Sequence, residues 1–526
     1  MNPETCVLGM ELGSTRIKAV LIDEAHQVVA QGSFEWENKL ENGIWTYSMD
    51  LIHQGVQACY ADLKKNVKDT YGVTLRKVAA MGVSAMMHGY LPFDKDGKQL
   101  CEFRTWRNTI TGEAAEKLTE AFDFNIPQRW SIAHLYQAML SGEAHVSEIA
   151  SITTLAGYIH RRLSGLDVMG VGEASGMFPV VLDEDGSVGF DPVMLQKFET
   201  ITKEMGYPWS IDAILPKVLK AGENAGYLTE EGALFLDPEG DLEAGIPLAP
   251  CEGDAGTGMA ATNSVRVNTG NVSAGTSDFA MLVTDRKLGV HREIDMVTTP
   301  SGLPVAMVHC NNCTSEINAW VELLSEFAGL IGAERSKGEL FTKLFTIALE
   351  GDMDCGGLIS YNYFSGEGVT DFDEGRPLFM RRPDAKFTLA NFMRMHLLSA
   401  LSTLKIGLDI LTKDEGLVVE KIYGHGGFFK TPVVGQRMLS AAIGAPVSVM
   451  ETAGEGGPYG MALLASYMVN KEAGESLEDY LDNKVFAGAP VSSIMADERD
   501  IEGFNAYLAQ YKKSLATEKS AVETLR

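Results

Sequence analysis

The amino-acid sequence predicts a two-domain α/β protein whose two halves share one plan. The chain has 526 residues, more than a single domain usually holds. Two similar segments, GSTRIKAVLID at residues 13–23 and GTSDFAMLVTD at residues 275–285, lie about half a chain length apart. Between and after them, short apolar runs alternate with helical patterns. Together these observations predict a duplicated fold of mixed strands and helices.

Each repeat is typical of a strand, a tight turn and a second strand. Each begins with Gly and two hydroxyl residues, continues into an apolar run, and reaches Asp at the same offset. Residues 7–12 and 271–274 precede the turns and supply the first strand of each hairpin. We therefore predict an N-terminal domain over residues 1–264, a C-terminal domain over 265–496, and a helical tail over 497–526.

The remaining elements follow from periodicity. Residues 78–84 form an apolar run that predicts a buried strand, and residues 111–122 and 132–140 have helical patterns. A Gly-rich segment, 454–460, opens a last core helix over residues 461–470. Residues 394–413 predict a long amphipathic helix with its core face formed by Leu397, Leu401, Leu404, Leu408 and Leu411.

Composition narrows the function classes. The formal net charge of −27 argues against nucleic acid as a partner, because phosphate backbones require a basic surface. Seven cysteines in 526 residues favour free thiols in a reducing cytoplasm over a disulfide framework. The single C-x-x-C, Cys310 to Cys313, lacks a second pair of zinc ligands. We expect no signal peptide at the start of this sequence and no transmembrane helix.

The two Gly-hydroxyl turns predict a nucleotide site. Glycine lets backbone approach a ligand closely, and the hydroxyl and N–H groups of such a turn can face phosphate oxygens. Two of these turns at matching positions predict a nucleotide held between the halves. Other nucleotide-binding classes are excluded, because the sequence has no G-x-x-x-x-G-K-[ST] loop, no H-R-D and D-F-G set, and no G-x-G-x-x-G after a strand.

The motifs, taken in order, resemble those of the FGGY family of carbohydrate kinases. The resemblance spans residues 7–470 and implies an actin/Hsp70-like, ribonuclease H-like ATPase fold with a cleft between its domains. The first motif, GMELGSTRIKA, resembles the family's N-terminal phosphate hairpin and implies nucleotide contacts by Gly13, Ser14, Thr15 and Lys18. Glu11 stands where the family usually has Asp, a position that implies contact with Mg²⁺.

Two further segments resemble the family's sugar contacts. GVSAMMHG, residues 82–89, is similar to the Gly-Gln-Met-His-Gly stretch of xylulose kinases, with Met86 in place of Gln. The resemblance implies that Met87 packs on the carbon face of the sugar and that His88 hydrogen-bonds its hydroxyls. TWRNT, residues 105–109, adds Trp106 and Arg107 as sugar-side candidates.

The segment EGDAGTGMA, residues 252–260, resembles the family's Gly-Gly-Asp segment. It implies that Asp254 is the catalytic base, contacts the sugar and also lies near the metal. A carboxylate is needed there because a sugar hydroxyl must lose its proton as its bond to phosphorus forms. Ala255 stands where many relatives have Asn or Gln, which removes one hydrogen bond to the sugar.

The second half supplies the remaining nucleotide contacts. Gly275, Thr276 and Ser277 form the second phosphate hairpin within NVSAGTSDFA. YGHGGFFKTPVVGQRMLS, residues 423–440, resembles the adenosine segment and implies contacts by Gly426, Gly427 and Gln436.

The resemblance implies a kinase that transfers the γ-phosphate of ATP, with Mg²⁺, to a hydroxyl of a small ketose. A pentulose such as xylulose is the first expectation; ribulose, a hexulose, glycerol and erythritol stay open. A chaperone-like ATPase would need a client-binding domain that this chain lacks room for. A sugar- or nucleotide-binding protein without catalysis also stays open, because Glu11, Met86 and Ala255 depart from the family pattern. We expect a cytoplasmic protein. Dimers are common in the family, so the resemblance leaves a homodimer open, and the sequence itself does not decide the oligomeric state.

Overall fold

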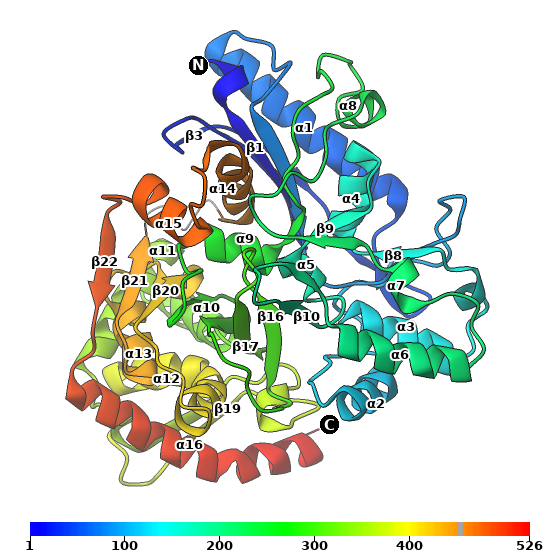
Figure 1. The fold of residues 1–526 in the computed structure, drawn as a ribbon. Coiled ribbons are helices and arrows are strands. Elements are labelled where there is room, and N and C mark those ends of the chain that lie inside the picture. Colours follow the sequence, from blue (N-terminus) through cyan, green and yellow to red (C-terminus); the bar gives the residue numbers. More distant parts are fainter. Residues whose placement is uncertain (451–455, 526) are drawn as a thin grey trace. The chain divides into compact units, whose positions relative to one another are not determined.

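The computed structural model describes residues 1–450 and 456–525 (Figure 1). The chain forms two compact units. The first comprises Met1–Val265, Met296–Val305 and Glu455–Gly488, and the second comprises Arg266–Asp295, Ala306–Gly454 and Ala489–Arg526. Segments 296–305 and 455–488 thus pack with the first half of the chain. The contiguous division into residues 1–264, 265–496 and 497–526 stays a prediction about domains.

The first unit is built on a five-stranded sheet in the order β13-β6-β1-β2-β3. The strands are β1 (Val7–Leu12), β2 (Arg16–Ile22), β3 (Val28–Glu35), β6 (Ala80–Ala85) and β13 (Glu252–Gly253). The predicted hairpin forms, because β1 pairs antiparallel with β2. β6 is the strand predicted at residues 78–84, and it lies parallel to both β1 and β13.

Helices cover both faces of this sheet. In α14 (Gly456–Asn470), Ala462 approaches Gly9 of β1 so closely that a Cβ on Gly9 would lie 2.5 Å from its backbone nitrogen. On α1 (Met49–Tyr71), Leu63 approaches Gly32 of β3 in the same way. Gly32 shares a face with Met10 through the register, and neighbouring residues of a strand point to opposite faces. Helices α14 and α1 therefore lie on opposite faces, and the core fills both layers.

The other elements of the first unit connect these layers. They are β4 (Lys39–Glu41), β5 (Ile44–Thr46), β7 (Leu91–Phe93), α2 (Gly112–Phe122), α3 (Ser131–Leu140), β8 (Ser151–Thr153), α4 (Leu155–Ser164), β9 (Val168–Gly170), α5 (Val171–Ala174), β10 (Val180–Leu182), β11 (Val188–Phe190), α6 (Pro192–Glu204), α7 (Ile211–Ile214), β12 (Lys217–Leu219), α8 (Glu230–Leu236), α9 (Asp254–Ala261) and α15 (Leu477–Tyr480). Helices α2 and α3 confirm the helices predicted at residues 111–122 and 132–140.

The second unit repeats the plan of the first. Its sheet has the order β16-β17-β15-β14-β20-β21-β22, in which the predicted second hairpin is the antiparallel pair β14 (Thr269–Ala274) and β15 (Asp278–Val283). β14 also lies parallel to β20 (Lys421–His425), as β1 does to β6. The remaining strands are β16 (Ile294–Thr298), β17 (Pro304–Cys310), β18 (Leu358–Tyr361), β19 (Leu378–Arg381), β21 (Val447–Met450) and β22 (Val491–Ile494).

Helix α12 (Leu389–Asp409) is the core helix of the second unit. It confirms the amphipathic prediction, since all five leucines of the predicted face are buried, the last in the π-helical turn Ile410–Asp414. The tail forms α16 (Glu498–Thr524), which is fixed to α12 by a buried ion pair between Arg394 and Asp500 at 2.7 Å. The other helices are α10 (Ser315–Leu330), α11 (Lys337–Ile347) and α13 (Val434–Ile443). Among residues 1–450 and 456–525, no helix has the length and apolar character needed to span a membrane.

Candidate active site

Three predicted motifs meet at one edge of the first unit's sheet. Because β1, β6 and β13 run parallel, with Leu12 opposite Ala85 and Ala85 opposite Gly253, their carboxyl ends lie side by side. The phosphate turn follows β1, the sugar motif follows β6, and Asp254 follows β13 directly. Ligands of open α/β sheets bind at this edge.

Asp254 contacts the sugar motif directly. Its Oδ1 accepts a hydrogen bond of 3.2 Å from the backbone N–H of Met87. The residue is exposed to solvent at the first turn of α9, so a substrate can reach it. Crowding by surrounding protein atoms raises the pKa of the carboxyl, while the N–H groups of Met87 and Ala255 act in the opposite direction. A carboxyl with a raised pKa in an accessible position is suited to accept a proton.

Glu11 lies in the same neighbourhood as Asp254. Burial, and then the charge of Asp254, raise the pKa of Glu11 to about 8, while Lys18, opposite Glu11 in the hairpin register, lowers it. A Cβ placed on Gly457, in the first turn of α14, would lie 1.3 Å from Glu11 Oε2. The carboxyl therefore lies against the amino end of α14, which favours negative charge.

His88 has a strained backbone and a ring held on both sides. Its φ of +69° lies in the left-handed region, which non-glycine residues adopt mainly where surrounding structure enforces it. Ring Nδ1 is 3.1 Å from the carbonyl of Gly176, and Nε2 is 3.1 Å from Nε of Arg129. These partners assign the proton to Nδ1 and make Nε2 the acceptor. Both ring nitrogens thus contact protein, and the role of His88 as a sugar contact stays a prediction.

The two TWRNT candidates diverge in the structure. The indole N–H of Trp106 donates to Ser14 Oγ at 3.2 Å, which places Trp106 beside the phosphate turn. The guanidinium of Arg107 stacks on the ring of Trp45, 3.9 Å from its centroid, and donates to Asn38. Trp106 therefore adjoins the predicted site. The contacts of Arg107 are with Asn38 and Trp45, in the segment before α1.

In the second unit, the hairpin turn and the predicted adenosine segment lie together. The N–H of Gly275 donates to the Ser277 carbonyl at 2.9 Å, which closes the turn. Gly426 has a φ of +98°, and a Cβ there would lie 2.5 Å from the carbonyl oxygen of Ala274. Only glycine can therefore bring the 426–427 segment against the end of β14.

The side chain of Gln436 holds a helix and two strands of this unit together. This side chain is buried, and its Nε2 donates to the carbonyls of Val447 at 3.0 Å and Ser492 at 2.9 Å. The amide thereby joins α13 to β21 and β22. Its predicted contact with the adenine base would require these bonds to open.

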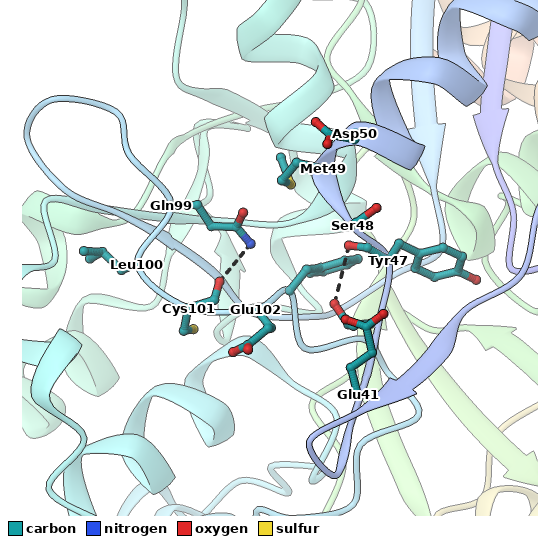
Figure 2. A pocket seen from close by; sticks show the side chains of 11 residues that line it. Glu41, Tyr47, Ser48, Met49, Asp50, Gln99, Leu100, Cys101 and Glu102 are labelled. Carbon is teal, nitrogen blue, oxygen red and sulfur yellow. Dashed lines mark hydrogen bonds between the residues drawn. The ribbon is translucent and has the colours of Figure 1, made fainter.

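A separate hollow of about 470 Å³ lies elsewhere in the first unit (Figure 2). It is lined by residues 46–50 and 99–103 together with Glu41, and Gln99 donates to the Cys101 carbonyl within one wall. It includes none of the site residues predicted from the sequence. We therefore place the site at the sheet edge rather than in this hollow.

Comparison with known proteins identifies the family. The N-terminal domain of the FGGY family of carbohydrate kinases matches residues 6–260, and its C-terminal domain matches residues 270–469. The chain belongs to the FGGY family. It is therefore a carbohydrate kinase, a phosphotransferase with an alcohol group as acceptor, and kinases of this family use ATP.

The relatives of this FGGY kinase are named for different substrates. A xylulose kinase from Haemophilus influenzae is 21% identical over 85% of this chain and 91% of its own. A glycerol kinase from Thermococcus kodakarensis is 24% identical over 54% of each chain.

Solved structures confirm the predicted fold. A ligand-bound xylulose kinase from Lactobacillus acidophilus has a TM-score of 0.79 at 17% identity, over 98% of this chain and 99% of its own. A gluconate kinase from Lactobacillus acidophilus has a TM-score of 0.78 at 17% identity, with the same coverage. A Plasmodium falciparum glycerol kinase with ADP has a TM-score of 0.74 at 15% identity, over 98% of each chain.

The donors in the first unit of this FGGY kinase are compatible with Mg²⁺. Glu11 and Asp254 offer hard carboxylate oxygens, and their mutual repulsion would be relieved by a cation. No group of three or more Cys, His, Asp or Glu in residues 1–450 and 456–525 is arranged to hold a metal. Mg²⁺ at nucleotides usually takes one or two protein carboxylates together with water and phosphate oxygens, which these two carboxylates fit.

Sequence reasoning missed a second layer of buried carboxyls behind Asp254. Glu252 accepts hydrogen bonds from the N–H groups of Gly172, at 3.4 Å, and Glu173, at 3.0 Å. Burial raises the pKa of Glu252 to about 8, and it also raises the pKa of Glu173 well above its ordinary value. The same short turn of α5 leads to Gly176, whose carbonyl contacts His88. Glu252 begins the segment EGDAGTGMA, but nothing in the local sequence marks its contact with residues 172–173.

Arg129 was missed for a different reason. It is a single basic residue on the loop before α3, and nothing in its local sequence marks it. Its 3.1 Å contact with His88 places it at the site.

Proposed function

We propose that this FGGY kinase phosphorylates a small ketose with ATP and Mg²⁺, and that a pentulose such as xylulose is its substrate. The observation that carries the proposal is the hydrogen bond between Asp254 and Met87, which joins the predicted base to the predicted sugar contact. Support for the substrate class comes from the Haemophilus relative, which matches along most of both chains. The seven free thiols further favour a cytoplasmic location.

In the proposed reaction, Asp254 accepts the proton of the sugar hydroxyl as that oxygen bonds to the γ-phosphorus and the bond to ADP breaks. Met87 lies beside the base, and its apolar side chain would pack against the sugar carbons. Glu11 and Asp254 would hold Mg²⁺, which when bound neutralises phosphate charge.

Each unit, taken by itself, offers candidate nucleotide contacts. The turn at Gly13–Thr15 and the turn at Gly275–Ser277 each offer N–H and hydroxyl donors to phosphate oxygens. Gly426 and Gly427 offer a surface without side chains for adenosine. Catalysis then depends mainly on positioning and electrostatic stabilisation.

The test is ADP release from Mg²⁺-ATP with a panel of ketopentoses, ketohexoses, aldoses, aldonic acids and polyols. Strong stimulation by a pentulose supports the proposal. Stimulation only by another sugar or polyol supports the kinase and corrects the substrate. ATP binding without stimulation by any compound would favour the alternative of a sugar- or nucleotide-binding protein, for which the departures at Glu11, Met86 and Ala255 supply a reason.

A further inference from the structure

All three carbonyl oxygens of the first phosphate turn, Gly13–Thr15, accept hydrogen bonds from two aromatic residues. The indole N–H of Trp36 donates to the Gly13 carbonyl at 2.6 Å, and the hydroxyl of Tyr47 donates to the Ser14 carbonyl at 2.6 Å. The backbone N–H of Trp36 donates to the Thr15 carbonyl at 3.2 Å. We call Trp36 and Tyr47 the aromatic pair.

The aromatic pair determines where the N–H groups of the turn point. In a planar trans peptide, the C=O and the following N–H point in opposite directions. With the Gly13 and Ser14 carbonyls held by the pair, the N–H groups of Ser14 and Thr15 are directed to the opposite side. Consecutive N–H groups aimed one way form a concave site for an anion.

The hydroxyl of Ser14 is a further donor for an anion at this turn. Its Oγ accepts the indole N–H of Trp106 at 3.2 Å. Because a hydroxyl that accepts one hydrogen bond keeps its own hydrogen to donate, Ser14 can offer that hydrogen to a phosphate oxygen.

The aromatic pair is itself held firmly. The two side chains are buried, and their rings lie 4.3 Å apart at an interplanar angle of 31°. Burial also raises the pKa of the Tyr47 hydroxyl to about 12, so it stays a donor. Figure 2 shows Tyr47 on the wall of the hollow, with its ring directed away from Gln99. Pre-organised donors lose little entropy when an anion arrives.

We propose that Trp36 and Tyr47 are positioning residues that aim the donors of Ser14 and Thr15 at an ATP phosphate, which rests on the proposed role of the Gly13–Thr15 turn. Their contacts act through the turn carbonyls and leave the sugar motif untouched. Loss of one contact should therefore weaken phosphate binding and spare the sugar.

The test compares Tyr47→Phe and Trp36→Phe with a matched control, Tyr71→Phe. Tyr71 also donates its hydroxyl to a backbone carbonyl, that of Val29 at 3.0 Å, in the same unit. For Tyr47→Phe we expect KM for Mg²⁺-ATP to rise about 3- to 10-fold, the effect of one lost hydrogen bond. The KM for the sugar should stay within about twofold, and Tyr71→Phe should match the native protein in both constants.

Calorimetry separates the phosphate contribution from the rest of the nucleotide. Tyr47→Phe should weaken binding of ATP and leave binding of adenosine unchanged, because adenosine has no phosphate. A Tyr47→Phe variant with the ATP affinity of Tyr71→Phe would overturn the inference, as would an equal loss for ATP and adenosine. Trp36→Phe provides the same test if Tyr47→Phe folds poorly.

Failure of the proposed function gives a different result. Native protein that binds ATP but phosphorylates no sugar would refute the kinase assignment, and the calorimetric comparison would still decide the role of the pair. Native protein that does not bind ATP would overturn both.

Discussion

Replacing Asp254 with Asn tests the assignment of the catalytic base most directly. Asn has nearly the same shape, and its Oδ1 can still accept the 3.2 Å hydrogen bond from the N–H of Met87. The amide cannot accept the hydroxyl proton at any working pH. Since a positioned general base contributes about 10²- to 10⁴-fold to rate, kcat should fall by that factor, or about 3 to 5 kcal/mol in activation free energy.

The fold should survive the change, because the surrounding protein already disfavours charge on Asp254. The melting temperature should therefore stay equal or rise slightly, and ATP affinity should change little. Asp191→Asn is the matched control, since Asp191 also accepts backbone N–H groups at a helix start, those of Val193 and Met194. Asn caps helices as well as Asp does. Sugar-dependent ADP release by Asp254→Asn within about tenfold of the native rate would refute the reasoning.

Three further changes test other parts of the site and fold. Gly457→Ala places a Cβ 1.3 Å from Glu11 Oε2, so displacement of that carboxyl should lower kcat about 10²-fold in steady-state assays. Glu252→Ala leaves the buried N–H groups of Gly172 and Glu173 without their acceptor, and urea unfolding should show a loss of about 2 kcal/mol; a stability equal to the native value would contradict it. In the second unit, burial raises the pKa of Glu367 from 4.5 to about 7, so its contribution to stability is complete below pH 4.5 and is lost as pH rises through 7. The melting temperature of the native protein should therefore fall between pH 5 and 8 relative to that of Glu367→Gln. The loss corresponds to about 3 kcal/mol in the free energy of unfolding. A difference in melting temperature that does not change with pH would contradict this prediction.

The parts of the fold that the sequence predicts are those with local causes. The hairpin turns can be recognised in the sequence because glycine followed by hydroxyl residues precedes an apolar run in each half, and both hairpins form as expected. The leucines of α12 recur at helical spacing, and burial of that face follows from the spacing alone. Asp254 and Met87 were brought together by motif order, and the structure gives the hydrogen bond that joins them.

The parts that sequence reasoning did not reach depend on contacts between distant segments. Trp36 and Tyr47 have no local mark of function; only the folded turn shows that their donors meet its carbonyls. The contact of α14 with β1 joins residues more than 400 positions apart, which no periodicity reports. The sequence also did not show that the Gln436 amide donates hydrogen bonds to two backbone carbonyls, and its contact with the adenine base stays a prediction.

Under the proposed function, the duplicated sheet gives each unit a part of the chemistry. In each unit, a hairpin strand and a later parallel strand end at one edge, with Leu12 opposite Ala85 in the first and Ser273 opposite His425 in the second. The same backbone plan therefore delivers a Gly-hydroxyl turn to that edge twice. The residues after the neighbouring strands differ between the units: in the first they are Met87, His88 and the carboxyl of Asp254, whereas β20 leads into glycines. Proton transfer needs an ionisable side chain and adenosine binding needs open backbone. Under the proposed function, the residues after β6 and β13 therefore suit the sugar chemistry, and those after β20 suit adenosine.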